Sequence, residues 1–138
     1  EQSEDAALIQ SLLDIMESEK LDYTNTFRNL TQALTNKITP ELESEIAKSW
    51  INSFQKRHHK ESFTLSKKLV LMNNTNPKFI LRNYMAQEVI EAAEESNYLE
   101  LETLIKIITN PFEEHEDFQS FAERSPEWAK DIEISCSS

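Results

Sequence analysis

The fold class is decided by the stretch DYTNTFRNLTQAL at residues 22–34. Its apolar side chains recur at i, i+4, i+7 and i+11, at Tyr23, Phe27, Leu30 and Leu34. Side chains at these spacings share one face of an α-helix, whereas a half-buried strand needs strict alternation. Asp22 stands before the first of them, and its carboxylate can accept the hydrogen bond that caps a helix N-terminus. The stretch therefore predicts an amphipathic helix that begins after Asp22.

The same periodicity predicts a helix on each side of this stretch. Upstream, Ser3 can cap a helix whose inward stripe is Leu8, Leu12 and Met16, with Ile9 and Leu13 beside it. Downstream, Thr39 and Pro40 have the pattern of a cap followed by proline at the first helical position. The inward stripe predicted for that third helix is Leu42, Ile46, Trp50 and Phe54.

Three further helices are predicted in the second half of the chain. The fourth spans about residues 62–72, and the fifth opens at Asn76-Pro77, runs to about residue 95 and is expected to be the most buried. Asn97 and Glu100 resemble a capping box for the sixth helix, which ends before Pro111. Its predicted inward side chains are Leu101, Leu104, Ile105 and Ile108.

These patterns predict an all-α fold, an irregular bundle of about six helices in a single domain that spans residues 1–138. The composition changes at Phe112, after which the chain is acidic and aromatic. Residues 112–138 are therefore predicted to be an extended aromatic tail that wraps onto a core. Short helices are expected in it at about residues 115–123 and 126–131.

Glycine is absent from all 138 residues, and this count excludes several classes of protein. Phosphate loops and dinucleotide-binding turns need glycine, because only its backbone approaches a phosphate closely at positive φ. A nucleotide enzyme contained wholly in these residues is therefore not expected. The net charge of −11 also excludes nucleic acid as a general partner, because a strongly acidic surface repels polyanions.

The charge is unevenly distributed along the chain. Residues 48–82 hold eight basic side chains opposed only by Glu61, at Lys48, Lys56, Arg57, Lys60, Lys67, Lys68, Lys78 and Arg82. One interpretation is a patch that faces an anion or an acidic partner. The other is a pair of basic helices packed beside the acidic first helix, and we favour it because runs of charge are usually solvated faces.

Cys136 is the single cysteine, so no internal disulfide is possible and a reducing compartment, the cytoplasm, is predicted. No apolar run reaches the length of a membrane span, and no signal peptide is visible. The chain begins with Glu1 rather than methionine, which indicates an excised fragment or a processed product.

No residue of the chain is predicted to be catalytic or to bind a metal. His58 and His59 are adjacent and point in different directions on a helix, so with Glu61 they do not complete a zinc site. His115 lies between two glutamates and is expected to be solvated. The carboxylates at Glu91, Glu94 and Glu95 have the spacing of an exposed helix face. Cys136 has no basic neighbour that would lower the pKa of its thiol.

Several motifs, in this order along the chain, resemble the C-terminal region of the SelO family (selenoprotein O, YdiU-like). They are DYT with Phe27-Arg28, NPKFILRNYMAQ at 76–87, IEAAE at 90–94, NPF at 110–112, PEWA at 126–129 and SCSS at 135–138. The resemblance covers nearly the whole chain. Within it, Asn76, Pro77, Lys78, Arg82, Asn83 and Trp128 are taken as family signature residues with a structural role.

The resemblance implies a much longer parent protein with a kinase-like fold, which transfers AMP from ATP to the Ser, Thr or Tyr hydroxyls of protein substrates. ATP and Mg²⁺ (or Mn²⁺) would be cofactors of that parent, bound by residues upstream of this chain. The implied partners are the parent's own kinase-like lobe, which the 112–138 tail would contact, and the protein substrates. An isolated fragment would then expose an apolar patch where the lobe is missing.

Cys136 is the one position whose family role can be carried over. The resemblance implies a redox-regulatory residue, which pairs with a cysteine near the activation loop, and a cysteine rather than selenocysteine suggests a bacterial protein. Two alternatives remain open. The chain could be a stand-alone helical interaction module, or a small thiol-dependent redox protein, although the latter lacks a Cys-x-x-Cys pair.

Overall fold

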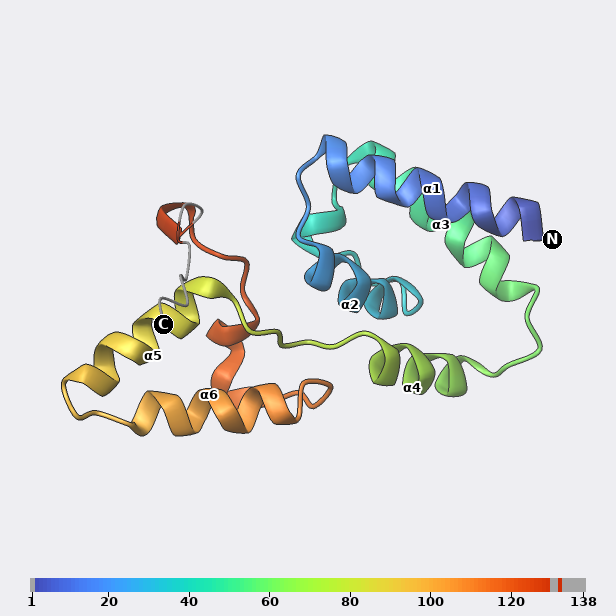
Figure 1. Cartoon of the computed structure of the whole chain (residues 1–138). Coiled ribbons are helices and arrows are strands. Elements are labelled where there is room, and N and C mark those ends of the chain that lie inside the picture. Colours follow the sequence, from blue (N-terminus) through green and yellow to red (C-terminus); the bar gives the residue numbers. More distant parts are fainter. Residues whose placement is uncertain (1, 130–131, 133–138) are drawn as a thin grey trace. The chain divides into compact units, whose positions relative to one another are not determined.

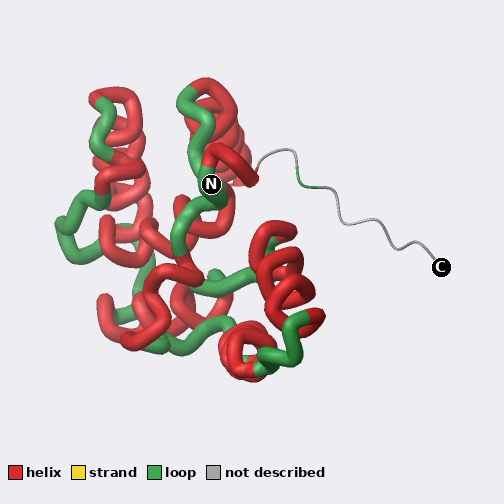
Figure 2. Tube along the Cα trace, turned by 90° about the vertical axis from the view of Figure 1, so that its left-hand side faces the viewer, coloured by secondary structure: helices red, strands yellow, loops and turns green. Residues whose placement is uncertain are grey.

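The computed structural model describes residues 2–129 and 132, and among these it contains helices and no strand. The all-α fold class is thus confirmed (Figures 1 and 2). The α-helices of this part of the chain are α1 (Gln2–Ser18), α2 (Tyr23–Ala33), α3 (Glu45–His59), α4 (Leu65–Thr75), α5 (Asn83–Glu94) and α6 (Leu99–Thr109). Three short 3₁₀ helices accompany them, namely η1 (Pro40–Leu42), η2 (Glu116–Ala122) and η3 (Glu127–Ala129).

The chain divides into two compact units, Glu1–Asn76 and Pro77–Ser138, a subdivision that the sequence pattern did not predict. In the first unit α1 packs along α3, and α2 packs against α4 (Figure 1). Its core consists of Leu12, Ile15, Met16, Leu30, Ala33, Leu42, Ala47, Trp50, Ile51 and Phe54. This cluster includes the inward residues predicted for the first and third helices, apart from Leu8, which is partly buried, and Ile46.

Helix α2 begins where its sequence predicted. The Asp22 carboxylate accepts a hydrogen bond from the Asn25 backbone N–H at 2.9 Å, so the predicted cap is formed. Leu30 is buried and Phe27 is partly buried against the core. Tyr23 at the first turn is instead exposed, and its ring lies 4.7 Å from that of Phe27.

The third helix begins later than predicted. Pro40 opens only the 3₁₀ turn η1, and the Ser44 hydroxyl caps α3 by accepting from the Ala47 N–H at 3.1 Å. The buried face of α3 runs through Ala47, Trp50, Ile51 and Phe54, so Ile46 lies beside this face rather than on it. Trp50 and Phe54 are buried with their rings stacked at 5.1 Å, but Ile46 is 62% exposed.

The prediction for residues 76–82 was wrong. These residues lie outside any helix, and α5 begins only at Asn83, after Arg82 with an extended backbone. The backbone N–H groups of Lys78 and Phe79 both donate to the Pro111 carbonyl, at 2.8 and 3.2 Å. The Pro111 carbonyl, which is distant in sequence, thus pairs with the backbone N–H groups of the two residues that follow Pro77.

In the second unit α5 and α6 lie side by side around a small cluster of Met85, Val89 and Leu104 (Figure 1). Helix α5 was expected to be the most buried, which is wrong, because only Met85 and Val89 of its residues are buried. Of the side chains predicted to point inward from α6, Leu104 is buried but Ile105 is 48% exposed. Ile107 takes the buried position that the pattern assigned to its neighbours.

The predicted capping box of α6 is wrong, because Asn97 is not the N-cap and makes no bond with Glu100. Tyr98 is the N-cap and makes no side-chain cap bond, while the Asn97 side chain accepts from the Leu99 N–H at 3.3 Å. The two short helices expected in the tail are present as η2 and η3. The end of the tail, including Cys136, lies outside the described residues.

Candidate functional site

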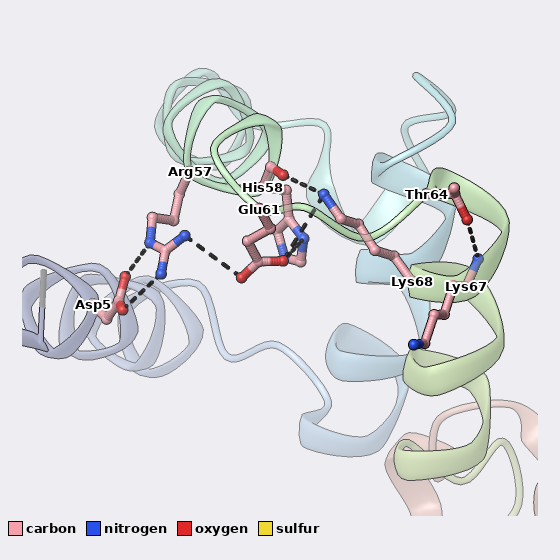
Figure 3. Close-up of polar contacts among 7 residues, drawn as sticks. All are labelled: Asp5, Arg57, His58, Glu61, Thr64, Lys67 and Lys68. Carbon is pink, nitrogen blue, oxygen red and sulfur yellow. Dashed lines mark hydrogen bonds and ion pairs between the residues drawn. The ribbon is translucent and has the colours of Figure 1, made fainter.

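The C-terminal end of α3 carries the densest group of charged contacts in the first unit. We call it the Glu61 cluster, and its members are Asp5, Arg57, His58, Glu61 and Lys68 (Figure 3). They come from α1, from α3, from the link after it and from α4. The cluster therefore ties three helices of this unit together through two carboxylates, because Asp5 joins α1 to Arg57 and Glu61 joins Arg57 and His58 to Lys68 of α4.

Arg57 makes a two-pronged contact with Asp5. Its Nε lies 2.5 Å from Asp5 Oδ1 and its Nη2 lies 3.0 Å from Oδ2, while Nη1 reaches Glu61 Oε1 at 3.5 Å (Figure 3). This planar fork is the geometry in which arginine binds a carboxylate most specifically. The hydrogen bonds from Arg57 hold the pKa of Asp5 below its ordinary value of 3.8.

His58 is half-buried on the other side of Glu61. Its ring makes an edge contact with Phe54 at 4.4 Å, and its Nδ1 lies 3.4 Å from Glu61 Oε2 without the geometry of a hydrogen bond. Burial lowers the pKa of His58 from its ordinary 6.5, and the nearby Glu61 opposes this only in part. Neutral imidazole is therefore favoured in the folded chain.

Lys68 is buried, which is unusual for lysine because its charge must keep partners when it leaves water. Its ammonium group donates to the His58 backbone carbonyl and lies 3.9 Å from Glu61 Oε2 (Figure 3). The His58 carbonyl lies in the last turn of α3, so the ammonium group beside it also complements the helix dipole. The Thr64 hydroxyl accepts from the Lys67 N–H at 3.4 Å and caps α4, the helix that carries Lys68.

Two hollows of about 330 Å³ each adjoin the Glu61 cluster, and both are lined by His58 and Glu61. One lies among apolar side chains of α1, α2 and α3, including Leu12, Leu30 and Trp50. The other is more polar and is lined by Gln55, His59 and Lys68 among others. Because Arg57 and Lys68 are each matched by a carboxylate or a carbonyl, the cluster has the character of a structural clasp.

The basic stretch at 48–82 has two interpretations, as a patch that faces an anion or an acidic partner and as basic helices packed beside the acidic first helix. Contacts of three of its residues bear on this choice. Arg57 contacts Asp5 of the acidic first helix, as the packed-helix interpretation requires. Lys48 pairs with Glu45 at 3.0 Å within α3, and Lys78 pairs with Glu114 at 2.7 Å within the second unit. The stretch is therefore divided between two units, and Lys48, Arg57 and Lys78 each pair with a carboxylate of their own unit.

The structure brings no set of metal ligands together in the part of the chain that it describes. Within residues 2–129 and 132, no three His, Cys, Asp or Glu side chains converge as ligands of an ion would. His59 is exposed, and His115 uses its Nε2–H to donate to the Asn110 carbonyl at 2.9 Å. No helix in this part of the chain has the length and apolar character that a membrane span needs.

The family signature segment lies in the second unit and is held by what we call the Pro111 clasp, formed by Lys78, Phe79, Pro111, Glu114 and Gln119. Besides the two backbone bonds to Pro111, Lys78 Nζ donates to Glu114 Oε2 at 2.7 Å, to the Glu114 carbonyl at 3.1 Å and to Gln119 Oε1 at 2.6 Å. Phe79 is 1% exposed, and its ring meets that of His115 at 5.3 Å. Lys78 and Arg82 do not share a helix face, because the segment lies outside any helix.

The remaining signature residues occupy separate places. The Asn76 carbonyl accepts from Arg28 Nη1 at 2.9 Å, and the same nitrogen donates to the Asn73 carbonyl at 2.7 Å, so Arg28 closes the end of α4. The Asn83 side chain donates to the Ile132 carbonyl at 3.2 Å. Trp128 is 62% exposed, and its ring meets Tyr84 edge-on at 5.9 Å.

The partners that complete these contacts were missed from the sequence. Glu114 and Gln119 had only the signal of an acidic, polar tail, and Asp5 had only its place in an acidic first turn. The left-handed backbone of His115, with φ at 40°, turns the chain so that Gln119 can donate to the Glu114 and His115 carbonyls, each at 2.9 Å. A positive φ at a residue other than glycine leaves little trace in a sequence.

Known proteins match this chain over nearly its whole length. The family described as protein adenylyltransferase SelO matches residues 1–109. A protein nucleotidyltransferase YdiU from Aliivibrio salmonicida is 37% identical over 141 residues, covering 99% of this chain and 29% of the relative. The YdiU of Marinomonas sp. is 38% identical, over 95% of this chain and 28% of the relative. That of Pseudomonas fluorescens is 36% identical, over 99% and 29%.

The chain thus spans less than a third of the length of these relatives. The family match covers the whole of the first unit. It covers the second unit in part, since residues 1–109 include both of its long helices. From this match and these identities, the chain belongs to the SelO family of protein adenylyltransferases, the family of the YdiU nucleotidyltransferases.

Proposed function

We propose that this chain is a non-catalytic helical region of a longer protein adenylyltransferase, in which it supports a kinase-like catalytic lobe. Family membership, together with the chain's coverage of only 29% of its relatives, carries this proposal. The longer protein would transfer AMP from ATP to Ser, Thr or Tyr hydroxyls of protein substrates. Each transfer joins the α-phosphorus to the hydroxyl oxygen and releases pyrophosphate, while the hydroxyl proton leaves to solvent or a base.

The nucleotide and the divalent metal are assigned to the remainder of the longer protein. These 138 residues contain no glycine for a phosphate loop. Within the Glu61 cluster the charged side chains pair with one another, and within the Pro111 clasp Lys78 pairs with Glu114. No step of the transfer is therefore placed on a residue of this chain.

The supporting role rests on the surface that the chain leaves uncovered. Large apolar side chains with about half or more of their surface exposed occur in both units, among them Ile46, Val70, Leu99 and Trp128. None of these side chains needs an explanation by itself, but together they leave apolar surface in both units on which a partner would pack. A stand-alone interaction module would show the same exposure, and the two are separated by whether the intact protein transfers AMP.

Cys136 is proposed to make the activity of the longer protein sensitive to redox state. Cys136 and a cysteine of the catalytic lobe would form a disulfide by thiol–disulfide exchange, in which a cellular disulfide accepts the two electrons and leaves as two thiols. A reducing compartment, the bacterial cytoplasm, would keep the bond open under ordinary conditions.

The experiment measures transfer of labelled AMP from ATP to protein by the longer polypeptide, with and without reductant. Wild type and the Cys136→Ser variant are compared. A reductant effect in wild type that is absent in the variant supports the redox role. Equal transfer in all four reactions removes the redox role and leaves structural support. No transfer under any condition contradicts the adenylyltransferase proposal and favours the interaction module.

A further inference from the structure

Helix α4 carries a second stripe of side chains on the face opposite the one that it buries. Toward the core, α4 places Lys68, which is buried, and Met72, which packs against the apolar cluster of the first unit. Away from it, Lys67, Val70, Leu71 and Asn74 are exposed at i, i+3, i+4 and i+7, the spacing of one helix face, and Phe63 precedes the helix beside Lys67. We call it the α4 stripe, and its members are Phe63, just before the helix, and Lys67, Val70, Leu71 and Asn74 within it.

The α4 stripe is apolar enough to be a poor solvent-facing surface. Phe63, Val70 and Leu71 are 48%, 56% and 47% exposed. Lys67 Nζ lies 4.2 Å from the centre of the Phe63 ring, so the ring and the ammonium group already form one continuous surface. Single exposed apolar residues need no explanation, but Val70 and Leu71 on one helix face, with Phe63 beside Lys67, mark an interaction surface.

The charge around the α4 stripe is opposite to that of the chain as a whole. No aspartate or glutamate occurs from Ser62 to Arg82, while the whole chain has a net charge of −11. Glu61, just before this stretch, lies beside Arg57, His58 and Lys68, which are the cations that it pairs with. A partner surface that presents carboxylates beside aliphatic side chains would satisfy both the apolar groups and the lysine.

We propose that the α4 stripe is the surface on which the catalytic lobe of the longer protein docks, through an acidic amphipathic segment of that lobe. This inference rests on the proposed function. More than two thirds of each YdiU relative lies outside the part that this chain matches, so ample polypeptide is available to cover the stripe. A helix that lays aliphatic side chains across Val70 and Leu71 would place a carboxylate within reach of Lys67.

The test is the rate of thiol labelling at position 70 in the longer polypeptide. Val70→Cys is introduced with Cys136→Ser, and the labelled peptide is quantified by mass spectrometry in native buffer and in urea. Docking predicts labelling about tenfold or more slower in native buffer than in urea, since a tenfold preference for the docked state leaves about a tenth of the molecules open. The matched control is Asn52→Cys, at an exposed position of α3, which should label at similar rates in both.

Each outcome bears on the proposal. Adding Lys67→Glu to the Val70→Cys variant should restore fast labelling at position 70 by placing a carboxylate against the acidic segment. Equal labelling rates at position 70 in native buffer and urea overturn the docking surface. Protection that disappears on dilution, together with a dimer mass in sedimentation, also overturns it and assigns the stripe to a second copy. AMP transfer measured on the same protein separates the two ideas, because transfer with fast labelling contradicts only the docking.

Discussion

The two compact units are built on cores of very different size. In Glu1–Asn76 ten buried apolar side chains form one cluster, whereas the cluster described in Pro77–Ser138 consists of Met85, Val89 and Leu104. The second unit compensates with polar contacts, above all the Pro111 clasp. Burial of apolar surface is the dominant stabilising contribution in folding, so a unit with little of it depends on specific bonds or on a partner. The first unit is therefore expected to be the more stable of the two.

The largest expected effect is the loss of Trp50. Trp50→Ala removes a buried ring that stacks on Phe54 and leaves the Leu8 carbonyl without the indole N–H that donates to it at 2.9 Å. We expect the free energy of unfolding of the first unit to fall by about 3–5 kcal/mol. Urea unfolding followed by circular dichroism measures this, and Trp128 fluorescence reports the second unit separately. A shift of both signals together would contradict the independence of the two cores.

The Pro111 clasp should matter next. Lys78→Met keeps most of the apolar stem but removes three hydrogen bonds to Glu114 and Gln119. Because bonds to a charged group stabilise by more than neutral ones, the second unit should lose about 1.5–3 kcal/mol. The measurement is the urea midpoint from fluorescence in a Trp50→Phe background, in which Trp128 is the one tryptophan. Arg124→Met, at an exposed position of the same unit, is the control and should change it little.

The N-terminal cap of α2 should contribute less to the stability of the first unit than its buried core does. Asp22→Ala removes the acceptor of the Asn25 N–H and should cost about 1 kcal/mol, whereas Asp22→Asn keeps an acceptor and should cost less. Thermal unfolding of both variants tests this. An equal loss in the two variants would mean that the charge of Asp22, and not its hydrogen bond, stabilises the helix.

The smallest effect is a dependence on pH through His58. Its folded-state pKa is below the ordinary 6.5, so folding favours the neutral ring. Below pH 6.5 the unfolded chain therefore binds more protons at His58 than the folded chain does. The free energy of unfolding then falls as the pH is lowered from 6.5 to the folded-state pKa of His58. Unfolding of the first unit measured between about pH 7.5 and pH 5 should show this decline. His58→Gln should flatten it, and an unchanged decline in that variant would assign it to other groups.

The sequence predicted what depends on local pattern and missed what depends on distant partners. Asp22 caps α2, and Trp50 and Phe54 are buried, because cap chemistry and helical spacing act within a few residues. Pro77 has an equally good local pattern for a helix start, yet the segment after it, residues 78–82, lies outside any helix. The deciding acceptor, the Pro111 carbonyl, lies far along the chain and leaves no signal near Pro77.

The candidate sites show the same limit. Lys78 was selected by resemblance, but its partners Glu114 and Gln119 were indistinguishable from other polar residues of an acidic tail. The Glu61 cluster needs α1, α3 and α4 to converge, and only the convergence distinguishes Asp5 from the other acidic residues of its helix. The role of Cys136 stays a prediction, since that residue lies outside the described part of the chain.

The central claim, that this chain supports AMP transfer without performing it, is tested most directly by dividing the longer polypeptide. Transfer of labelled AMP from ATP to protein is measured for the intact polypeptide, for one lacking these 138 residues, and for this chain alone after circular dichroism has verified its helices. We predict transfer by the intact polypeptide, weaker or no transfer without the chain, and none by the chain alone. Transfer of AMP by the chain alone would contradict the account.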